Sequence, residues 1–476
     1  MRTLIQNGTV VTAQQYGAAD ILIKDEVILQ VGENLSHQGV DQVIDAAGLL
    51  VMPGGVDVHT HLALPMFDTV SSDDHYTGHK AAAFGGTTTV MDFIPHDDHD
   101  LMPNIERWHR KAKGLAAVDY SFHMNISQFD ESVLQQLEVL VEQGIPSAKM
   151  FTAYNRRMRL HDGEIFQVMR RCAEFGILPM LHAENGDVIE VLVQEAISAG
   201  HFEPVWHART RPAWGAAEAV FRGIAIAVQA GSPLYVVHMN TAGGVDQLAY
   251  AKSKGIPIFG ETCPPYLFFT EEDLARPDGA KWVCSPPMRS EEDQKRIWES
   301  LEEGIMDTVG TDHCPFFFDG TTRIEYEGEW IAIPGKELGK DDFRKIPNGL
   351  PGVGDRMPVL WTAAVNTGRI SPQRFVALMS TNPAKLFGMY PQKGAIQVGS
   401  DADIVLWDPD KELNYGVEIA QHRTDYNLFE GWALKGFPVK VFSRGELLVD
   451  EGEWFGKPGR GQFLHRKPFV VDSSLQ

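Results

Sequence analysis

The chain has 476 residues, 43% hydrophobic and 22% charged, so it can bury a large core and has an ordinary globular composition. Its formal net charge of -22 argues against nucleic acid or an anionic membrane as a partner. The four cysteines have no CxxC spacing, which favours reduced thiols in a cytoplasmic compartment. The N-terminus is too polar for a signal peptide, and no apolar run approaches the roughly 20 residues of a membrane span.

The two ends of the chain are both rich in short β-prone runs. Residues 9–12, 21–23 and 27–31 near the start, and 403–407, 439–442 and 447–449 near the end, are predicted strands. This pattern of short β-prone runs at both ends predicts one small β-sandwich domain formed by residues 1–52 and 392–460. Residues 461–476 form a mostly polar tail, which is either loose or a possible subunit contact.

The middle of the chain alternates between apolar, β-branched runs and helix-length stretches. The predicted strands are 56–59, 87–92, 120–125, 147–150, 178–181, 234–237, 257–259 and 306–311. The intervening helices include 131–143, 164–175, 213–229 and 291–302. Such alternation predicts parallel βαβ units, and eight of them predict an α/β fold that closes as a (β/α)₈ TIM barrel over residues 53–391.

Four histidines lie where predicted strands end. His59 and His61 are two residues apart and therefore leave the same face of their strand. A pair of this kind alone is equally typical of histidines held by hydrogen bonds. His182 and His238 follow two further strands. Because the carboxyl ends of barrel strands meet at one mouth, the four imidazoles are expected to converge as metal ligands.

Two other residues extend this candidate metal centre. Asp312 follows the last predicted strand and can bind a cation and move a proton, although a helix N-cap is the alternative. Lys149 lies in a nearly apolar strand, where burial favours the neutral amine. It either pairs with a carboxylate or captures carbon dioxide as a carbamate, an anion whose two oxygens can bridge two metal ions.

Five of these six residues, all except His238, lie in segments through which the chain resembles the dihydropyrimidinase/D-hydantoinase family of the amidohydrolase superfamily. The segments are Pro53-Gly54-Gly55-Val56-Asp57-Val58-His59-Thr60-His61, Gly85-Gly86-Thr87-Thr88-Thr89, Lys149-Met150-Phe151, His182-Ala183-Glu184-Asn185-Gly186, Glu261-Thr262-Cys263-Pro264, Cys284-Ser285-Pro286-Pro287-Met288-Arg289, Thr311-Asp312-His313-Cys314 and Pro347-Asn348-Gly349. They span nearly the whole predicted barrel in order.

The resemblance implies a centre of two Zn²⁺ ions, other divalent ions being possible. One ion would be held by His59, His61 and Asp312, and the other by His182 and His238. Lys149, carboxylated by carbon dioxide to N6-carboxylysine, would bridge them, with a hydroxide as second bridge. The resemblance also implies a homotetramer.

The same resemblance implies the reaction, the hydrolytic ring opening of a dihydropyrimidine or a 5-substituted hydantoin to an N-carbamoyl amino acid. Tyr154 would stabilise the oxyanion, and Asp312 would act as general base and then acid. Tyr154, Ser285 and Asn348 would bind the ureide ring. Without the resemblance, Ser285 and Asn348 are ordinary loop residues.

Two loops would shape the pocket for the ring substituent. The loop after the first strand is apolar and favours hydrophobic or aromatic groups. The loop after the fourth strand carries arginines, which indicate either a solvated loop or tolerance of an acidic substituent. The residues concerned are Leu62, Leu64, Met66 and Phe67 in the first loop and Arg156, Arg157 and Arg159 in the other.

Other readings remain open. A dihydroorotase would have an arginine, and an allantoinase an asparagine, where this chain has Ala63, so both are weakened without being excluded. Some relatives are non-catalytic assembly or signalling proteins that have lost metal ligands, whereas this chain retains all six candidates. The polar loop with His96 and His99 resembles a metal cluster, but a solvated turn is favoured.

Overall fold

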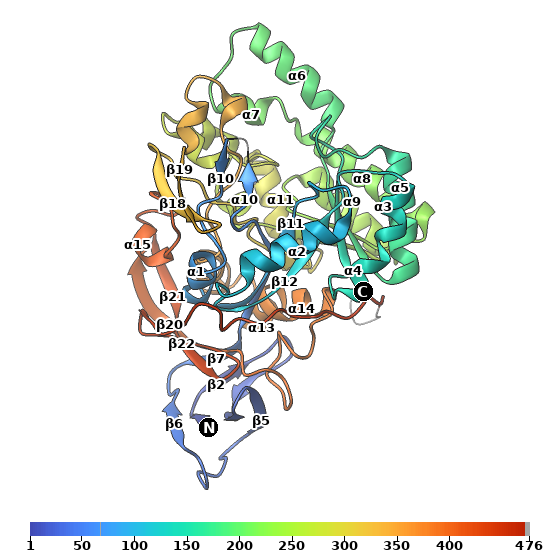
Figure 1. The fold of residues 1–476 in the computed structure, drawn as a ribbon. Helices are drawn as coiled ribbons and strands as arrows, with labels where there is room; N and C mark the ends of the chain where they lie inside the picture. Colours follow the sequence, from blue (N-terminus) through green and yellow to red (C-terminus); the bar gives the residue numbers. More distant parts are fainter. Residues whose placement is uncertain (67, 472–476) are drawn as a thin grey trace.

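The computed structural model describes residues 1–66 and 68–471 (Figure 1). A parallel sheet forms a barrel in the middle of the chain. Its strands are β8 (Gly55–Thr60), β11 (Thr87–Ile94), β12 (Asp119–Asn125), β13 (Ser147–Phe151), β14 (Leu178–His182), β15 (Leu234–Val236), β16 (Ile258–Thr262) and β17 (Thr308–Val309). A parallel bridge between Thr60 and His313 joins the first strand to the segment after the last. The predicted TIM barrel is therefore confirmed.

The barrel strands are buried along their whole length, which explains why they read as almost continuous apolar runs. Helices alternate with them: α1 (Thr77–Phe84), α2 (Leu101–Ala112), α3 (Glu131–Gln136), α4 (Glu138–Glu142), α5 (Asp162–Phe175), α6 (Gly186–Ser198), α7 (Val205–Arg209), α8 (Ala213–Ala230), α9 (Ala242–Ser253), α10 (Pro265–Phe268), α11 (Glu291–Glu302), α12 (Arg356–Leu360), α13 (Pro372–Val376), α14 (Asn382–Leu386) and, beyond the barrel, α15 (Val417–Ala420). None of the helices in the described part of the chain is both long and apolar enough to cross a membrane.

Two smaller sheets lie at one end of the barrel (Figure 1). One contains β5 (Val27–Gly32), β4 (Asp20–Lys24), β1 (Arg2–Gln6) and β6 (Gln42–Asp45). The other contains β23 (Glu453–Trp454), β22 (Glu446–Asp450), β21 (Ala433–Ser443), β20 (Ile404–Asn414), β7 (Leu50–Pro53), β2 (Thr9–Val11) and β3 (Tyr16–Ala18). Antiparallel pairing of β7 with β20 joins the two ends of the chain in one sheet. The separate sheet domain is thus present, while its boundaries at residues 52 and 392 stay a prediction.

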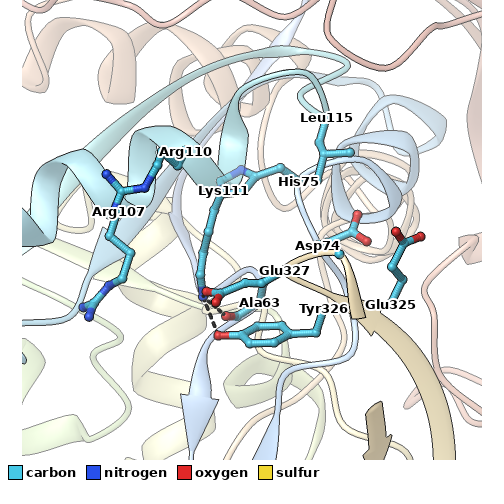
Figure 2. Close-up of a pocket in the computed structure, with 11 residues that line it drawn as sticks. Ala63, Asp74, His75, Arg107, Arg110, Lys111, Leu115, Glu325, Tyr326 and Glu327 are labelled. Atoms are coloured by element: carbon cyan, nitrogen blue, oxygen red, sulfur yellow. Dashed lines mark hydrogen bonds and ion pairs between the residues drawn. The ribbon is translucent and has the colours of Figure 1, made fainter. Parts of the chain in front are cut away.

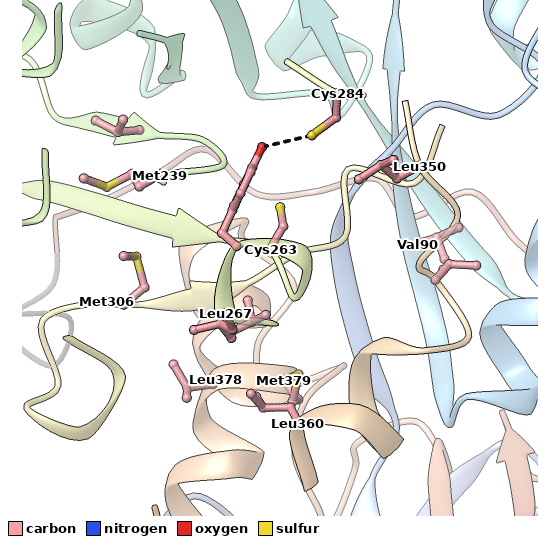
Figure 3. Close-up of a cluster of buried hydrophobic side chains, with 14 of the residues drawn as sticks. Val90, Met239, Cys263, Leu267, Cys284, Met306, Leu350, Leu360, Leu378 and Met379 are labelled. Atoms are coloured by element: carbon pink, nitrogen blue, oxygen red, sulfur yellow. Dashed lines mark hydrogen bonds between the residues drawn. The ribbon is translucent and has the colours of Figure 1, made fainter. Parts of the chain in front are cut away.

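Each part of the molecule has its own buried apolar cluster. Ile21, Ile404 and Leu406 belong to a cluster between the two small sheets. A far larger cluster packs the barrel strands against the helices, and Figure 3 shows part of it, with Cys263 and Cys284 among Met, Leu and Val side chains. All four cysteines are buried free thiols, as expected for reduced residues.

The described part of the tail, residues 461–471, lies against the barrel of the same chain. Leu464 N–H donates to Tyr120 O at 2.7 Å, and Phe469 N–H donates to Gly176 O at 2.7 Å. The Arg466 guanidinium is buried and donates to Ser121 Oγ at 2.9 Å and Ser147 Oγ at 2.7 Å. The tail is therefore packed against the barrel as far as Phe469. Its role as a subunit contact stays a prediction, and residues 472–476 lie outside the described part.

Candidate metal centre

Five strand ends bring the six candidate ligands to one mouth of the barrel. His59 is in β8 and His61 follows it, Lys149 is in β13, and His182 ends β14; His238 and Asp312 come shortly after β15 and β17. The carboxyl ends of parallel barrel strands form one face. The predicted convergence depended on this geometry, and the six side chains do lie together.

Asp312 joins the first two histidines. Its Oδ1 lies 3.1 Å from His59 Nε2 and 3.0 Å from His61 Nε2. One donor atom from each of these three residues lies within 4.8 Å of the others, a spacing that could hold one metal ion. Lys149 Nζ lies 3.2 Å from His59 Nε2, so the lysine borders this group directly.

The other two histidines form a second group beside the first. His182 Nδ1 lies 3.0 Å from His238 Nε2. The ring centroids of His59 and His238 are 5.4 Å apart, which connects the two groups. The mouth of the barrel therefore holds one three-residue group that could bind a metal ion, with a pair of imidazole nitrogens beside it.

Two buried glutamates hold the imidazoles in orientation. Glu261 Oε1 lies 2.6 Å from His59 Nδ1, which leaves Nε2 of that ring facing Asp312. Glu184 Oε2 lies 2.9 Å from His182 Nε2, which leaves Nδ1 facing His238. Carboxylates behind ligating histidines commonly fix the ring and its tautomer. Both glutamates lie within the motifs quoted above, but nothing in their sequence context predicts this role.

The protonation states of His61 and His238 also fit cation binding. Burial lowers the pKa of His61 to about 4 and holds the pKa of His238 well below its ordinary value. Neutral imidazole is the form that binds metals. Nδ1 of each of these two rings is buried without a hydrogen-bond partner among the described residues. The residues present therefore suit a divalent cation.

Lys149 lacks the partner that an ordinary buried lysine has. Its side chain is buried, and desolvation lowers its pKa. Within the described ranges no carboxylate lies at ion-pair distance from it. Nζ instead lies 4.2 Å from the centroid of the Phe93 ring and 5.4 Å from that of Phe151. The alternative of a lysine paired with a carboxylate is not found.

A cavity of about 450 Å³ opens onto the centre and is lined by the three predicted substrate residues, Tyr154, Ser285 and Asn348. Asn348 Nδ2 donates to Ser285 Oγ at 3.2 Å, and Tyr154 lines the same cavity. The Tyr154 and His182 ring centroids are 5.0 Å apart. Burial raises the pKa of Tyr154 well above its ordinary value, so its phenol stays a proton donor. All three residues therefore line one cavity, in which Tyr154 lies beside His182.

The two predicted specificity loops contribute unequally to this cavity. Leu64 and Met66 line it, whereas Leu62 is buried and is not part of its lining. Phe67 lies outside the described residues. From the arginine loop, Arg157 lines the cavity. The cavity therefore has an apolar side and a cationic group.

Lys111 of α2 stabilises the apolar loop through a hydrogen bond to its backbone. Lys111 Nζ donates to Ala63 O at 2.9 Å and to Tyr326 Oη at 2.7 Å, and it lies 3.5 Å from Glu327 Oε1 (Figure 2). Tyr326 ends β18 (Thr322–Tyr326), which forms a hairpin with β19 (Glu329–Ile333). Ala63 faces a separate cavity of about 590 Å³ there and does not line the cavity over the centre.

The histidine loop after β11 is not a metal cluster. His96 Nδ1 accepts from the N–H groups of Ser127 at 3.2 Å and Gln128 at 3.3 Å, and Nε2 donates to His99 O at 3.2 Å. Both ring nitrogens of His96 are thus used, and the residue is buried rather than solvated. His99 is half exposed and pairs with Asp130 at 2.7 Å. The loop is a turn stabilised by these hydrogen bonds and this ion pair.

The fold and the site together define a parallel α/β barrel with a candidate metal centre at its carboxyl-terminal mouth. A model of the amidohydrolase family matches residues 50–448. The chain is 44% identical over 473 residues to the D-hydantoinase of Geobacillus stearothermophilus, covering 98% of this chain and 97% of that protein. It is 42% identical over 472 residues to the D-hydantoinase of Rhizobium radiobacter, covering 98% and 100%.

Solved structures agree with these sequence relatives. The crystal structure of dihydropyrimidinase from Brevibacillus agri matches with a TM-score of 0.94 at 44% identity, covering 99% of this chain and 100% of that one. The L-hydantoinase from Arthrobacter aurescens matches with a TM-score of 0.86 at 30% identity, covering 97% and 99%. This chain belongs to the amidohydrolase family, in its D-hydantoinase and dihydropyrimidinase branch.

Proposed function

We propose that this enzyme hydrolyses the ring amide of a cyclic ureide, a dihydropyrimidine or a 5-substituted hydantoin, and releases an N-carbamoyl amino acid. The observation that carries the proposal is the pairing of two donor groups at the barrel mouth with the cluster of Tyr154, Ser285 and Asn348 beside them. The names of the relatives, D-hydantoinase and dihydropyrimidinase, support the same reaction class.

Two divalent ions, in our proposal Zn²⁺, would occupy the centre. His59, His61 and Asp312 would hold one ion, His182 and His238 the other, and carboxylated Lys149 would link the two sets as an N6-carboxylysine. When bound, such ions would lower the pKa of water and polarise a carbonyl group. The absence of a carboxylate partner for Lys149 in the described part of the chain supports this role.

The side chains would supply proton transfer, stabilisation of the oxyanion and orientation of the substrate. Asp312 would accept a proton from the attacking water and deliver it to the ring nitrogen as the C–N bond breaks. Tyr154 would donate its phenolic hydrogen to the carbonyl oxygen as negative charge develops there. Ser285 and Asn348 would orient the ureide, largely through their backbone groups. Water thereby adds across the amide, and no other reactant is needed.

Substitution of Lys149 tests the centre. Lys149→Ala should lose bound metal and turnover, because no other residue could bridge the two donor sets. Lys149→Arg should fail as well, since a guanidinium stays charged and cannot be carboxylated. Metal content by elemental analysis is the primary readout, and Lys411→Ala, at an exposed ion pair with Glu451, is the control. Two full zinc equivalents in Lys149→Ala, or full activity in Lys149→Arg, would refute the proposal.

A substrate panel tests the reaction itself. Dihydrouracil and 5-substituted hydantoins should be opened faster than allantoin or dihydroorotate. Residue 63 is where relatives acting on those two have asparagine or arginine. Here it is an alanine outside the cavity lining, with its carbonyl bound by Lys111. Preference for dihydroorotate or allantoin would favour those alternatives, and no hydrolysis of any ureide would favour a non-catalytic homologue. We further propose a cytoplasmic homotetramer, on family resemblance alone.

A further inference from the structure

We infer that Lys111 of α2 is a positioning residue that fixes the apolar wall of the cavity, formed by Leu64 and Met66, and thereby sets which ring substituents the enzyme accepts. This inference rests on the proposed ring-opening function and concerns its specificity. Lys111 is not part of the described lining of the cavity over the centre. It acts through the backbone of Ala63, whose carbonyl oxygen accepts a hydrogen bond from Lys111 Nζ at 2.9 Å (Figure 2).

The peptide group between Ala63 and Leu64 is bound on both sides. Its carbonyl oxygen accepts from Lys111 Nζ, and its N–H donates to Ser71 Oγ at 2.9 Å. Because a peptide group is planar, these two bonds fix the orientation of the whole unit. Leu64 lines the cavity directly after this unit, and Met66 lines it two residues further on. The orientation of the peptide group therefore decides where the apolar side chains lie.

Ala63 requires support because its backbone is left-handed. Its φ is 48°, a conformation that residues with a Cβ rarely adopt. Its N–H donates to Asp73 O at 2.7 Å, so hydrogen bonds stabilise both backbone polar groups of the residue. Without the bond from Lys111, we expect Ala63 to relax toward a more favourable conformation and Leu64 to move with it.

The Lys111 ammonium is itself fixed in place. Its side chain is only 7% exposed, and Nζ lies 4.5 Å from the centroid of the Trp108 ring and 4.6 Å from that of Tyr326. Nζ also donates to Tyr326 Oη at 2.7 Å and lies 3.5 Å from Glu327 Oε1. An ammonium positioned by two rings and a carboxylate loses little further freedom when it binds Ala63 O. The hydrogen bond is therefore preorganised, unlike a solvated contact at the surface.

The loop has two further supports that do not depend on Lys111. Trp108 Nε1 donates to Asp92 Oδ2 at 2.7 Å, and the other oxygen of this carboxylate accepts from Leu62 N–H at 2.8 Å. Val70 packs against the β18–β19 hairpin in a small buried cluster. Both contacts remain when Lys111 is replaced. We therefore expect the loop to stay folded while its peptide group loses one of its two hydrogen bonds.

The test compares unsubstituted hydantoin with 5-phenylhydantoin in the metal-loaded enzyme. Lys111→Met should raise KM for 5-phenylhydantoin about tenfold and leave its kcat within about twofold, because a displaced wall weakens binding without changing the reacting groups. Both constants for unsubstituted hydantoin should change less than about twofold. Arg110→Met is the matched control, since it removes the neighbouring cation of α2, which is exposed and lies 4.0 Å from Glu106. It should leave both substrates unchanged.

Two conservative variants and one structural readout test the route through the hydrogen bond. Tyr326→Phe removes an acceptor that orients the ammonium, so it should lower the preference for 5-phenylhydantoin about threefold. Lys111→Arg keeps a cationic donor and should retain part of the preference. Hydrogen exchange at the Ala63 and Leu64 amides should be faster in Lys111→Met than in wild type, with the metal content unchanged.

The outcomes separate this inference from the proposed function. Equal changes in KM for the two hydantoins in Lys111→Met, or the same loss in Arg110→Met, would overturn the inference while ring opening stands. If Lys111→Met does not fold, Tyr326→Phe decides, because an unchanged ratio of the two kcat/KM values in that variant would also overturn it. Failure of wild type to open either hydantoin would instead overturn the proposed function.

Discussion

Replacing Lys393 by Met should destabilise the junction between the barrel and the small sheets. The Lys393 ammonium is fully buried and lies 2.6 Å from Asp119, 2.9 Å from Asp401 and 2.9 Å from Asp403. Asp119 begins barrel strand β12, and Asp403 directly precedes β20 of the seven-stranded sheet. A single cation therefore joins acidic groups from both parts of the molecule.

The expected loss follows from what methionine leaves behind. Methionine fills a similar volume but removes the positive charge, so three carboxylates remain with Arg444 as the only adjacent cation in the described part of the chain. Removing one partner of a buried ion pair costs about 3–5 kcal/mol, because the other partner stays buried without compensation. We expect a loss of that size in the free energy of unfolding at pH 8. Lys411→Met, at the exposed pair with Glu451, should change it by less than about 1 kcal/mol.

The pH dependence should distinguish the two proteins. In wild type the cations Lys393 and Arg444 hold the pKa of Asp119 below its ordinary value. That contribution is present above the unfolded pKa and is lost as the pH falls. In Lys393→Met the buried carboxylates lose their shared ammonium, so the folded pKa of Asp119 should rise, and that of Asp403, which burial already raises in wild type, should rise further. The folded variant then binds protons more readily than its unfolded chain. The difference between variant and wild type in the free energy of unfolding should therefore narrow between pH 8 and pH 5.

Urea unfolding followed by tryptophan fluorescence, together with unfolding rates, measures this difference. The Lys411→Met control should follow wild type at every pH. A loss below about 1 kcal/mol at pH 8 would contradict the reasoning, given the 3–5 kcal/mol expected for a buried pair. A difference in the free energy of unfolding between variant and wild type that stays constant down to pH 5 would also contradict it.

Two predictions concern the candidate centre. Asp312→Asn should lower kcat by about 10²–10⁴-fold with a much smaller change in KM, because an amide cannot carry the proton. Steady-state kinetics on a hydantoin measures both constants. A normal kcat would contradict the proposed role of Asp312. Glu261→Gln should weaken metal binding by about 10–100-fold, because the carboxylate behind His59 is lost. Chelator competition measures that affinity, and an unchanged value would show that the glutamate does not support the ligand.

The barrel could be predicted because its strands are buried along their whole length. Such strands give continuous apolar runs, and each predicted run contains or overlaps an observed strand. The sequence predicts the ends of the helices and strands less well than their positions. Residues 131–143 form two short helices, α3 and α4, with Leu137 between them. The last strand was predicted over 306–311, but only Thr308–Val309 pairs as a strand, although Asp307 and Gly310 continue the hydrogen bonding to β16.

Tertiary contacts decide the parts of the site that sequence spacing does not encode. A histidine at a strand end points to the mouth whatever follows it, so the ligand candidates could be found. The carboxylate behind His59 lies 202 positions away, at Glu261, and no local pattern connects them. The three loop arginines are equivalent in sequence. In the structure Arg156 pairs with Glu190 and Arg159 with Asp187, while Arg157 lines the cavity.

The position of the buried acids explains how one mouth can hold both imidazoles and a lysine that has no carboxylate partner among the described residues. Glu261 and Glu184 each bind the outer nitrogen of a histidine, and Asp312 binds two inner nitrogens. A glutamate beside Lys149 would instead stabilise the ammonium, which cannot react with carbon dioxide. Because the acids bind histidines, burial among aromatic rings lowers the pKa of Lys149, and the proposed carboxylation requires that free amine. The same carboxylates thus orient the candidate ligands and leave the Lys149 amine without a carboxylate at ion-pair distance among the described residues.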